Sequence, residues 1–112
     1  MSECLFCGIV AGEIPSNKVY EDDVCYAFDD ISPEAAVHTL IVPKQHYASL
    51  NDQVPADVLG QLFERVHHVA ELKGIADSGY RTIVNTGNDA GQTVHHLHIH
   101  ILGGENLGEH IR

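Results

Sequence analysis

Positive charge and cysteine are both scarce in this 112-residue chain. Six Lys and Arg residues stand against sixteen Asp and Glu, which leaves a net charge of −10 at pH 7 with neutral histidines. A surface this acidic repels phosphate backbones, so we expect no extended nucleic-acid partner, although a small phosphorylated ligand in a locally positive pocket remains compatible. The three cysteines and the lack of a signal-peptide pattern near the N-terminus predict reduced thiols or metal ligands in a cytoplasmic protein.

Long apolar runs are missing too. No stretch reaches the about 20 residues that span a bilayer, so we expect no membrane segment. The chain has only four prolines and no low-complexity segment, and 44% of its residues are hydrophobic, which argues against disorder. This length suits one domain with one modest core, so we expect a single domain over residues 1–112.

The apolar patterns predict an α+β fold. Short β-rich runs at 18–21, 24–28, 39–42, 80–85 and 97–102 predict five strands. Apolar residues that recur every three or four positions predict one long helix over 56–73, and a short helix is expected over 5–11. Because the connections are tight, we expect a five-stranded antiparallel sheet. Pairing two chains would cover its edge strands and an apolar helix flank, so we also expect a homodimer.

Histidine is unusually abundant, and four of the nine histidines fall within positions 95–100. His96, His98 and His100 alternate with apolar residues at 97, 99 and 101. Residues two apart in a strand share a face, so the three imidazoles should project together while the apolar side chains point to the core. Such a ladder favours either metal binding or the transfer of protons and phosphoryl groups near neutral pH.

A loop with two glycines leads into this ladder, from Asn85 to Thr93. Gly87 and Gly91 allow backbone N–H groups to converge on an anion, and Thr93 adds a hydroxyl donor. Taken alone, the loop is compatible with an ordinary connection. Directly before three histidines that share a face, it predicts a phosphate-binding loop.

The spacing of Cys4 and Cys7 is typical of metal ligands and of redox pairs. A redox pair normally opens a helix within a βαβ pattern, which this sequence lacks, so the spacing favours metal. Cys25 lies within a predicted strand, and we expect it to be a small core residue.

The segment HHLHIHIL resembles the signature of the histidine-triad superfamily, in which histidines alternate with apolar residues. The likeness covers nearly the whole chain, through CLFCGIVAGEIPS, AFDDISP, HTLIVPKQH, NTGNDAGQTV and the LGG that follows the triad. The chain resembles the histidine-triad nucleotide-binding protein branch in particular. That resemblance implies a small homodimeric purine nucleoside phosphoramidase.

The resemblance also implies catalytic roles. His98 matches the family's nucleophile, which forms a covalent nucleotidyl-histidine intermediate and then releases the nucleoside monophosphate. His96 and His100 match the flanking histidines that position phosphate and assist proton transfer, and His38 matches a histidine of the same relay. An imidazole suits the first role because it is nucleophilic at neutral pH without a strong base.

The same resemblance implies the residues that hold the nucleotide. Asp30 matches the carboxylate that accepts hydrogen bonds from the ribose hydroxyls, although it is equally placed to cap the turn at Ser32-Pro33. The positions at the phosphate or the leaving group are Asn85, Gly91 and Thr93. The apolar walls of the base pocket are Phe6, Ile9, Phe28 and Ile31, of which Phe28 also suits the core.

Some superfamily members complete a tetrahedral zinc site with two cysteines and two histidines. The matching residues in this chain are Cys4, Cys7, His46 and His96. Two thiolates and two imidazoles are a closed structural zinc set, which would pin the N-terminus to the sheet without metal taking part in the chemistry. The resemblance therefore implies a structural Zn²⁺ as cofactor.

Three features depart from the phosphoramidase pattern. Thr93 stands where that branch more usually has serine, and a threonine at this position is also similar to the dinucleoside polyphosphate hydrolases. Asn85 and Gly103-Gly104, in contrast, favour the phosphoramidases. The tail over 105–112 has no aromatic residue. A dinucleoside polyphosphate hydrolase and a non-catalytic module that binds nucleotide or buffers metal therefore remain alternatives.

Overall fold

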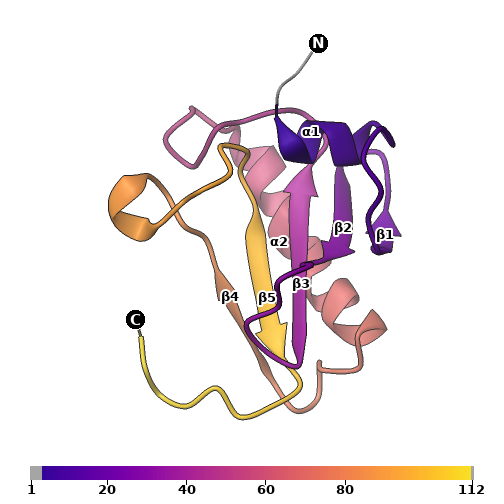
Figure 1. Cartoon of the computed structure of the whole chain (residues 1–112), viewed down its shortest axis with the longest axis vertical. Coiled ribbons are helices and arrows are strands. Elements are labelled where there is room, and N and C mark those ends of the chain that lie inside the picture. Colours follow the sequence, from indigo (N-terminus) through magenta and orange to yellow (C-terminus); the bar gives the residue numbers. More distant parts are fainter. Residues whose placement is uncertain (1–3, 112) are drawn as a thin grey trace.

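The computed structural model of the protein describes residues 4–111. The strands form one antiparallel sheet in the order β1-β2-β3-β5-β4, so that β5 lies between β3 and β4 (Figure 1). This confirms the predicted α+β fold with five antiparallel strands, one long helix and a short N-terminal helix. In chain order the elements are α1 (Leu5–Val10), β1 (Lys18–Glu21), β2 (Cys25–Asp29), β3 (Val37–Pro43), α2 (Ala56–Leu72), β4 (Tyr80–Ile83), the 3-10 helix η1 (Asn88–Ala90) and β5 (Ile99–Gly103).

The strand that carries the histidines is shorter than predicted. β5 begins at Ile99, so His96 and His98 precede it and only His100 lies in the strand. The reason is a contact with a segment distant in the chain, because the Leu97 N–H donates to the carbonyl of Tyr47 at 2.6 Å instead of to a neighbouring strand. The predicted strand 80–85 likewise ends at Ile83. The segment between the end of β4 at Ile83 and the start of β5 at Ile99 therefore contains no strand.

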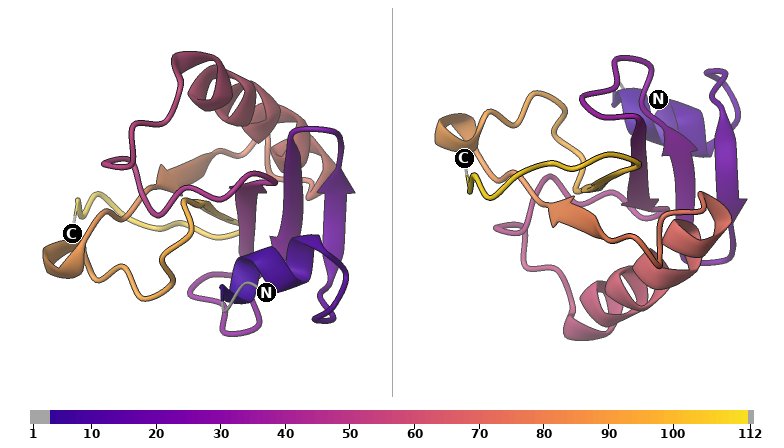
Figure 2. Two further views of the ribbon diagram at one scale, coloured as in Figure 1. Left: turned by 90° about the horizontal axis from the view of Figure 1, so that it is seen from above. Right: turned by 90° about the horizontal axis from the view of Figure 1, so that it is seen from below.

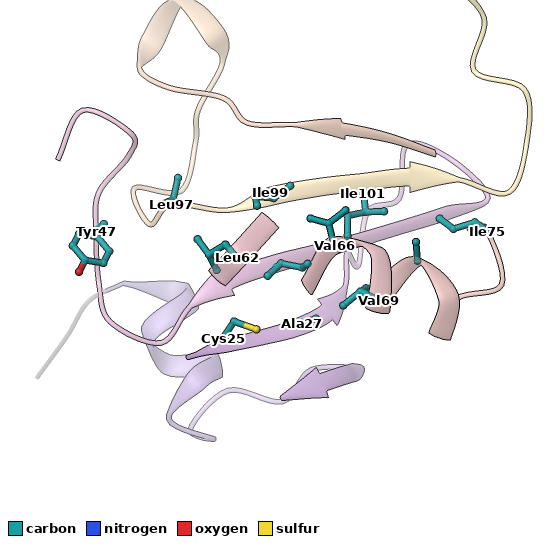
Figure 3. Close-up of a cluster of buried hydrophobic side chains, with 12 residues drawn as sticks. Cys25, Ala27, Tyr47, Leu62, Val66, Val69, Ile75, Leu97, Ile99 and Ile101 are labelled. Atoms are coloured by element: carbon teal, nitrogen blue, oxygen red, sulfur yellow. The ribbon is translucent and has the colours of Figure 1, made fainter. Parts of the chain in front are cut away.

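The two helices cover opposite faces of the sheet (Figure 2). Successive strand residues point to opposite faces, so β2 and β3 supply apolar side chains to two separate cores, while β5 supplies them to the larger core only. Under α1 lies a small core of Phe6, Ile9, Tyr26, Phe28, Leu40 and Val42. Under α2 lies the larger core shown in Figure 3, which contains Cys25, Ala27, Ile41, Tyr47, Leu62, Val66, Val69, Ala70, Ile75, Leu97, Ile99 and Ile101.

Helix α2 has one apolar stripe, as its sequence pattern predicts. Leu62, Val66, Val69 and Ala70 are buried against the sheet at spacings of three and four residues. The helix ends at Leu72, and Gly74 follows with a φ of +74°, a left-handed conformation that glycine adopts without strain. Among residues 4–111, no helix is both long and apolar enough to cross a membrane.

Asp22 ties the β1–β2 turn to α2. Its carboxylate accepts hydrogen bonds from the Tyr20 hydroxyl at 2.6 Å and from the N–H groups of Val24 and Cys25 at 2.8 and 3.0 Å. The Nε–H of Arg65, on α2, donates to the same carboxylate. Burial alone would raise the pKa of Asp22, but these donors hold it well below its ordinary value. The ionised carboxylate is therefore part of the folded structure.

Removing this carboxylate should destabilise the protein. We expect Asp22→Ala to lower the free energy of unfolding by about 2 kcal/mol or more, because four donors lose a charged acceptor. Asp23→Ala is the matched control, since Asp23 is the exposed neighbour in the same turn. Urea denaturation of both variants measures the difference, and equal midpoints for the two would show that the turn is not held by Asp22.

Candidate functional site

A cleft of about 560 Å³ opens on the face of the sheet that α1 covers. It is lined by α1, by the β2–β3 connection, by β3 and β5, and by the loop that follows β4. Its apolar end is formed by Leu5, Phe6, Ile9, Ile14, Phe28 and Ile31. Its polar end is formed by His38, Asn85, Gly91, Thr93 and His100. The apolar end therefore suits a flat apolar group, and the polar end suits a polar group that hydrogen-bonds to histidine, amide and hydroxyl side chains; Asp29, Asp30 and Glu34 also line the cleft.

His98 does not itself line the cleft, but its ring packs against that of His100, which does, and it is only 7% exposed. Its ring packs edge-on against Phe6 at 5.1 Å and against His100 at 4.8 Å between ring centroids. The Nδ1–H of His98 donates to the main-chain carbonyl of His96 at 2.7 Å. Because Nδ1 carries the proton, the Nε2 atom of the neutral ring keeps a free lone pair. In its neutral state, His98 thus has Nε2 available to accept a proton or to form a bond.

His38 and His100 form a second fixed pair. The main-chain N–H of Glu34 donates to Nδ1 of His38 at 3.0 Å, so the proton of neutral His38 is on Nε2. That Nε2 lies 2.9 Å from Nδ1 of His100 and donates to it. The proton of neutral His100 must then be on its own Nε2. A single main-chain N–H therefore sets the tautomers of two histidines in series.

The side-chain amide of Asn85 faces His100 at the end of this series, with 3.5 Å between the amide and Nε2 of His100. Because Nε2 of His100 carries a proton, the amide oxygen of Asn85 is the group that can accept from it, and the amide NH₂ then remains as a donor. Asn85 and His100 both line the cleft.

Asp30 has two observed contacts, and one is the cap considered from the sequence. Its Oδ1 accepts from the Ser32 N–H at 2.8 Å, which caps the turn. Its Oδ2 lies 3.6 Å from Nε2 of His38. A carboxylate has about four lone-pair positions, so capping leaves acceptor capacity facing the cleft.

The apolar end of the cleft is built around Phe6. Its ring meets that of Phe28 edge-on at 5.4 Å, and Phe28 is both a core residue and a cleft wall. Ile9 is buried beneath them. Ile31 differs from the other three because it is 89% exposed, at the mouth of the cleft. A ring that entered the cleft would cover it.

Gln92 is a polar residue of this region that the sequence analysis did not single out. It is 7% exposed, and its amide makes hydrogen bonds to three main-chain groups of the surrounding loops. A glutamine between Gly91 and Thr93 carries no sequence pattern that distinguishes a buried amide from an exposed one.

Cys4, Cys7, His46 and His96 converge beside the N-terminal end of α1. The Nδ1 atom of His96 lies 3.3 Å from Sγ of Cys4, 3.4 Å from Sγ of Cys7 and 3.2 Å from Nδ1 of His46. Tetrahedral zinc with ordinary bond lengths needs ligand atoms about 3.3–3.8 Å apart, so the four donors fit that ion. The Nε2–H of His96 donates to the Pro43 carbonyl at 2.9 Å, which directs its Nδ1 lone pair toward the cluster.

A second group of possible ligands does not fit a metal. Asp30, His38 and His100 also converge, with their ligand atoms within 4.8 Å of one another. However, the Glu34 N–H occupies the lone pair of His38 Nδ1, so Nε2 of His38 carries a proton and has no lone pair to offer. The geometry favours a hydrogen-bond relay at this position.

Burial keeps the triad histidines neutral. Desolvation lowers the pKa of His96 and of His98, although in each case a main-chain carbonyl that accepts from the ring opposes the shift. For His100, desolvation, with further lowering by His98 and His38, brings the pKa to about 4. At neutral pH the three rings are therefore uncharged, which is the state that nucleophilic attack requires.

The chain is similar to known proteins over nearly its whole length. Residues 11–107 match the HIT domain family. The purine nucleoside phosphoramidase of Escherichia coli is 46% identical over 109 residues, which covers 95% of this chain and 91% of that protein. An uncharacterised HIT-like protein of Synechococcus elongatus is 48% identical over 110 residues, or 96% of each chain.

Solved structures agree with this. A histidine triad protein from Clostridium difficile has a TM-score of 0.93 and 46% identity, and the match covers 98% of this chain and 97% of that one. A HIT family hydrolase from Legionella pneumophila has a TM-score of 0.90 and 41% identity, with 95% and 96% covered. Fold and site thus define a hydrolase of the histidine-triad type. The chain belongs to the HIT domain family, which confirms the resemblance seen in the sequence.

The low pKa of His100 should make stability depend on pH. Between its ordinary pKa of 6.5 and about 4, the unfolded chain binds a proton at His100 that the folded chain does not, so unfolding becomes easier as pH falls. Replacement by glutamine removes this contribution. From pH 7 to pH 5, the wild type should lose about 2 kcal/mol more unfolding free energy than His100→Gln. Parallel pH curves for the two proteins would contradict the assignment.

Proposed function

We propose that the protein hydrolyses purine nucleoside phosphoramidates or acyl adenylates through a covalent nucleotidyl-His98 intermediate and releases the nucleoside monophosphate. The observation that carries the proposal is the hydrogen bond from His98 Nδ1–H to the His96 carbonyl, because it leaves Nε2 unprotonated beside the cleft. Similarity to the Escherichia coli purine nucleoside phosphoramidase supports the substrate class.

In this proposal the nucleotide binds along the cleft. The purine stacks at the apolar end among Phe6, Ile9, Phe28 and Ile31, where two aromatic rings already meet edge-on. Asp30 accepts from the ribose hydroxyls with the lone pairs that its turn cap does not use. The phosphate lies at the polar end, where Asn85, Gly91, Thr93 and His100 line the cleft.

The reaction then has two displacements. Nε2 of His98 attacks the phosphorus, the phosphorus–Nε2 bond forms, and the bond to the leaving group breaks. The leaving amine or carboxylate takes the electron pair, and a leaving amine takes up one proton from solvent, which the attacking water of the second step gives back. Water attacks next, the phosphorus–Nε2 bond breaks, and the nucleoside monophosphate leaves with His98 neutral again. His38 and His100 supply the hydrogen-bonded path by which a proton can move at the phosphate.

We also propose that Cys4, Cys7, His46 and His96 hold one structural Zn²⁺. The support is the donor chemistry and the spacing of the four ligand atoms. The ion would cross-link α1, the segment after β3 and His96, which lies two residues before the proposed nucleophile. Its contribution would be to folding and position, with no step of the reaction on the metal.

Oligomeric state and location complete the proposal. We propose a homodimer, since β1 and β4 are the two edges of the sheet and Phe63 and Leu72 of α2 are about half exposed.

We propose a cytoplasmic location, because thiolate ligands persist in a reducing compartment. A dinucleoside polyphosphate hydrolase is the second candidate, since the Thr93 hydroxyl lines the phosphate end.

Removing the nucleophile should separate binding from turnover. His98→Ala should lower kcat on adenosine and guanosine phosphoramidates by about 10³-fold or more, while adenosine monophosphate still binds. His95→Ala, at an exposed neighbouring position, should keep the wild-type rate. If His98→Ala turns over normally while His100→Ala does not, the nucleophile is misassigned. Faster wild-type cleavage of diadenosine polyphosphates than of phosphoramidates would favour the second candidate.

Metal content should follow the cysteine pair. The purified wild type should contain about one zinc per chain, and the double variant Cys4→Ser, Cys7→Ser should contain almost none and melt at a lower temperature. Cys25→Ser is the control, because Cys25 is buried in the other core and should not affect zinc content. Elemental analysis decides the matter, and stoichiometric zinc in the double variant would reject the site.

A further inference from the structure

Gln92 lies in the loop that lines the cleft, but it has no assigned contact with substrate or metal. We propose that Gln92 is the positioning residue of the phosphate loop, defined as residues 85–94, and that its amide determines the enzyme's affinity for the phosphate group. This inference rests on the proposed function, in which that loop binds the phosphate.

The Gln92 amide is buried and almost fully hydrogen-bonded. Its Oε1 accepts from the Gly87 N–H at 2.9 Å. Its Nε2 donates to the carbonyl of Val94 at 3.1 Å and to that of Ala48 at 2.8 Å. Both amide protons and one lone pair of the oxygen are therefore used by main-chain groups. The side chain connects the two ends of the phosphate loop to each other and to the segment that follows β3.

The backbone of the loop is closed around this side chain. The Gln92 N–H donates to the Gly87 carbonyl at 3.1 Å, and the Gly91 N–H donates to the Asn88 carbonyl at 3.0 Å. Gly87 and Gly91 have φ values of +80° and +77°, which let the chain turn tightly at both ends of η1. The amide thus connects Gly87 to Val94 across a loop that contains Gly91 and Thr93 and begins two residues after Asn85.

The anchor outside the loop also holds the triad. Ala48 accepts from Gln92, and the preceding residue, Tyr47, accepts from the Leu97 N–H at 2.6 Å. Leu97 lies between His96 and His98. The two adjacent carbonyls of Tyr47 and Ala48 therefore fix both the phosphate loop and the nucleophile's segment relative to one short stretch of chain. If the phosphate loop moved relative to Tyr47 and Ala48, its hydrogen-bond donors would move away from the phosphorus that His98 attacks in the proposed reaction.

Only glutamine combines this length with one acceptor and two donor protons. Glutamate has the same shape, but its carboxylate cannot donate, so it would face the carbonyl oxygens of Ala48 and Val94 without a hydrogen bond. Methionine has a similar length and makes none of the three hydrogen bonds. Gln92→Glu and Gln92→Met therefore remove the function in two different ways, and their effects on affinity should agree.

The test compares a ligand that has phosphate with one that lacks it. By calorimetric titration, wild type should bind adenosine monophosphate more tightly than adenosine. In Gln92→Met and Gln92→Glu the affinity for the monophosphate should fall about tenfold or more, and that for adenosine should change less than about twofold. Tyr20→Phe is the matched control, because it removes one hydrogen bond, to Asp22, at a remote position and should leave both affinities unchanged.

The outcomes separate the inference from the proposed function. If wild type does not prefer the monophosphate, the proposed phosphate loop is wrong. If wild type prefers it and the folded Gln92 variants keep the same ratio, Gln92 is merely structural and the inference is overturned.

A measurement on the wild type keeps the inference testable if both variants fail to fold. The Gly87 N–H should exchange with solvent at least about tenfold more slowly than an unprotected amide, already without ligand. Unprotected exchange at Gly87 would overturn a loop held in advance by Gln92.

Discussion

The hydrogen bond from His98 Nδ1–H to the carbonyl of His96, at 2.7 Å, is the contact on which the rest of the site depends. It selects one of two neutral tautomers and so decides which nitrogen can attack. The same logic applies at His38, whose Nδ1 accepts the Glu34 N–H, and through it at His100. Main-chain groups therefore set the tautomers of the site, and burial lowers the pKa of His98 and of His100, which keeps those two rings neutral.

His96 connects this chemistry to the N-terminal segment. Its carbonyl accepts from His98, its Nε2–H donates to the Pro43 carbonyl, and its Nδ1 faces the two cysteines. Phe6, which lies between those cysteines in the chain, packs against both His96 and His98. An ion held by the four converging donors would thus stabilise the short helix α1, one wall of the cleft and the position of His98 together.

The sequence predicted which histidines share a face better than it predicted the extent of the strand that carries them. The alternation of histidine with apolar residues placed His98 and His100 on the face opposite Ile99 and Ile101, because strand periodicity reports which side is buried. It overestimated the strand, since the Leu97 N–H pairs with Tyr47, a contact between distant segments that no local pattern contains. Gln92 was missed for the same reason, and Asp30 proved to cap its turn as well as face the cleft.

The tautomer of His98 is the most direct test of this account. Side-chain ¹⁵N NMR of the wild-type protein at pH 7, with His98→Ala used to assign the resonances, reports which ring nitrogen carries the proton. The account predicts a neutral His98 with a protonated Nδ1 whose hydrogen exchanges slowly, and an unprotonated Nε2. A neutral ring protonated at Nε2, or a doubly protonated ring at this pH, would contradict it.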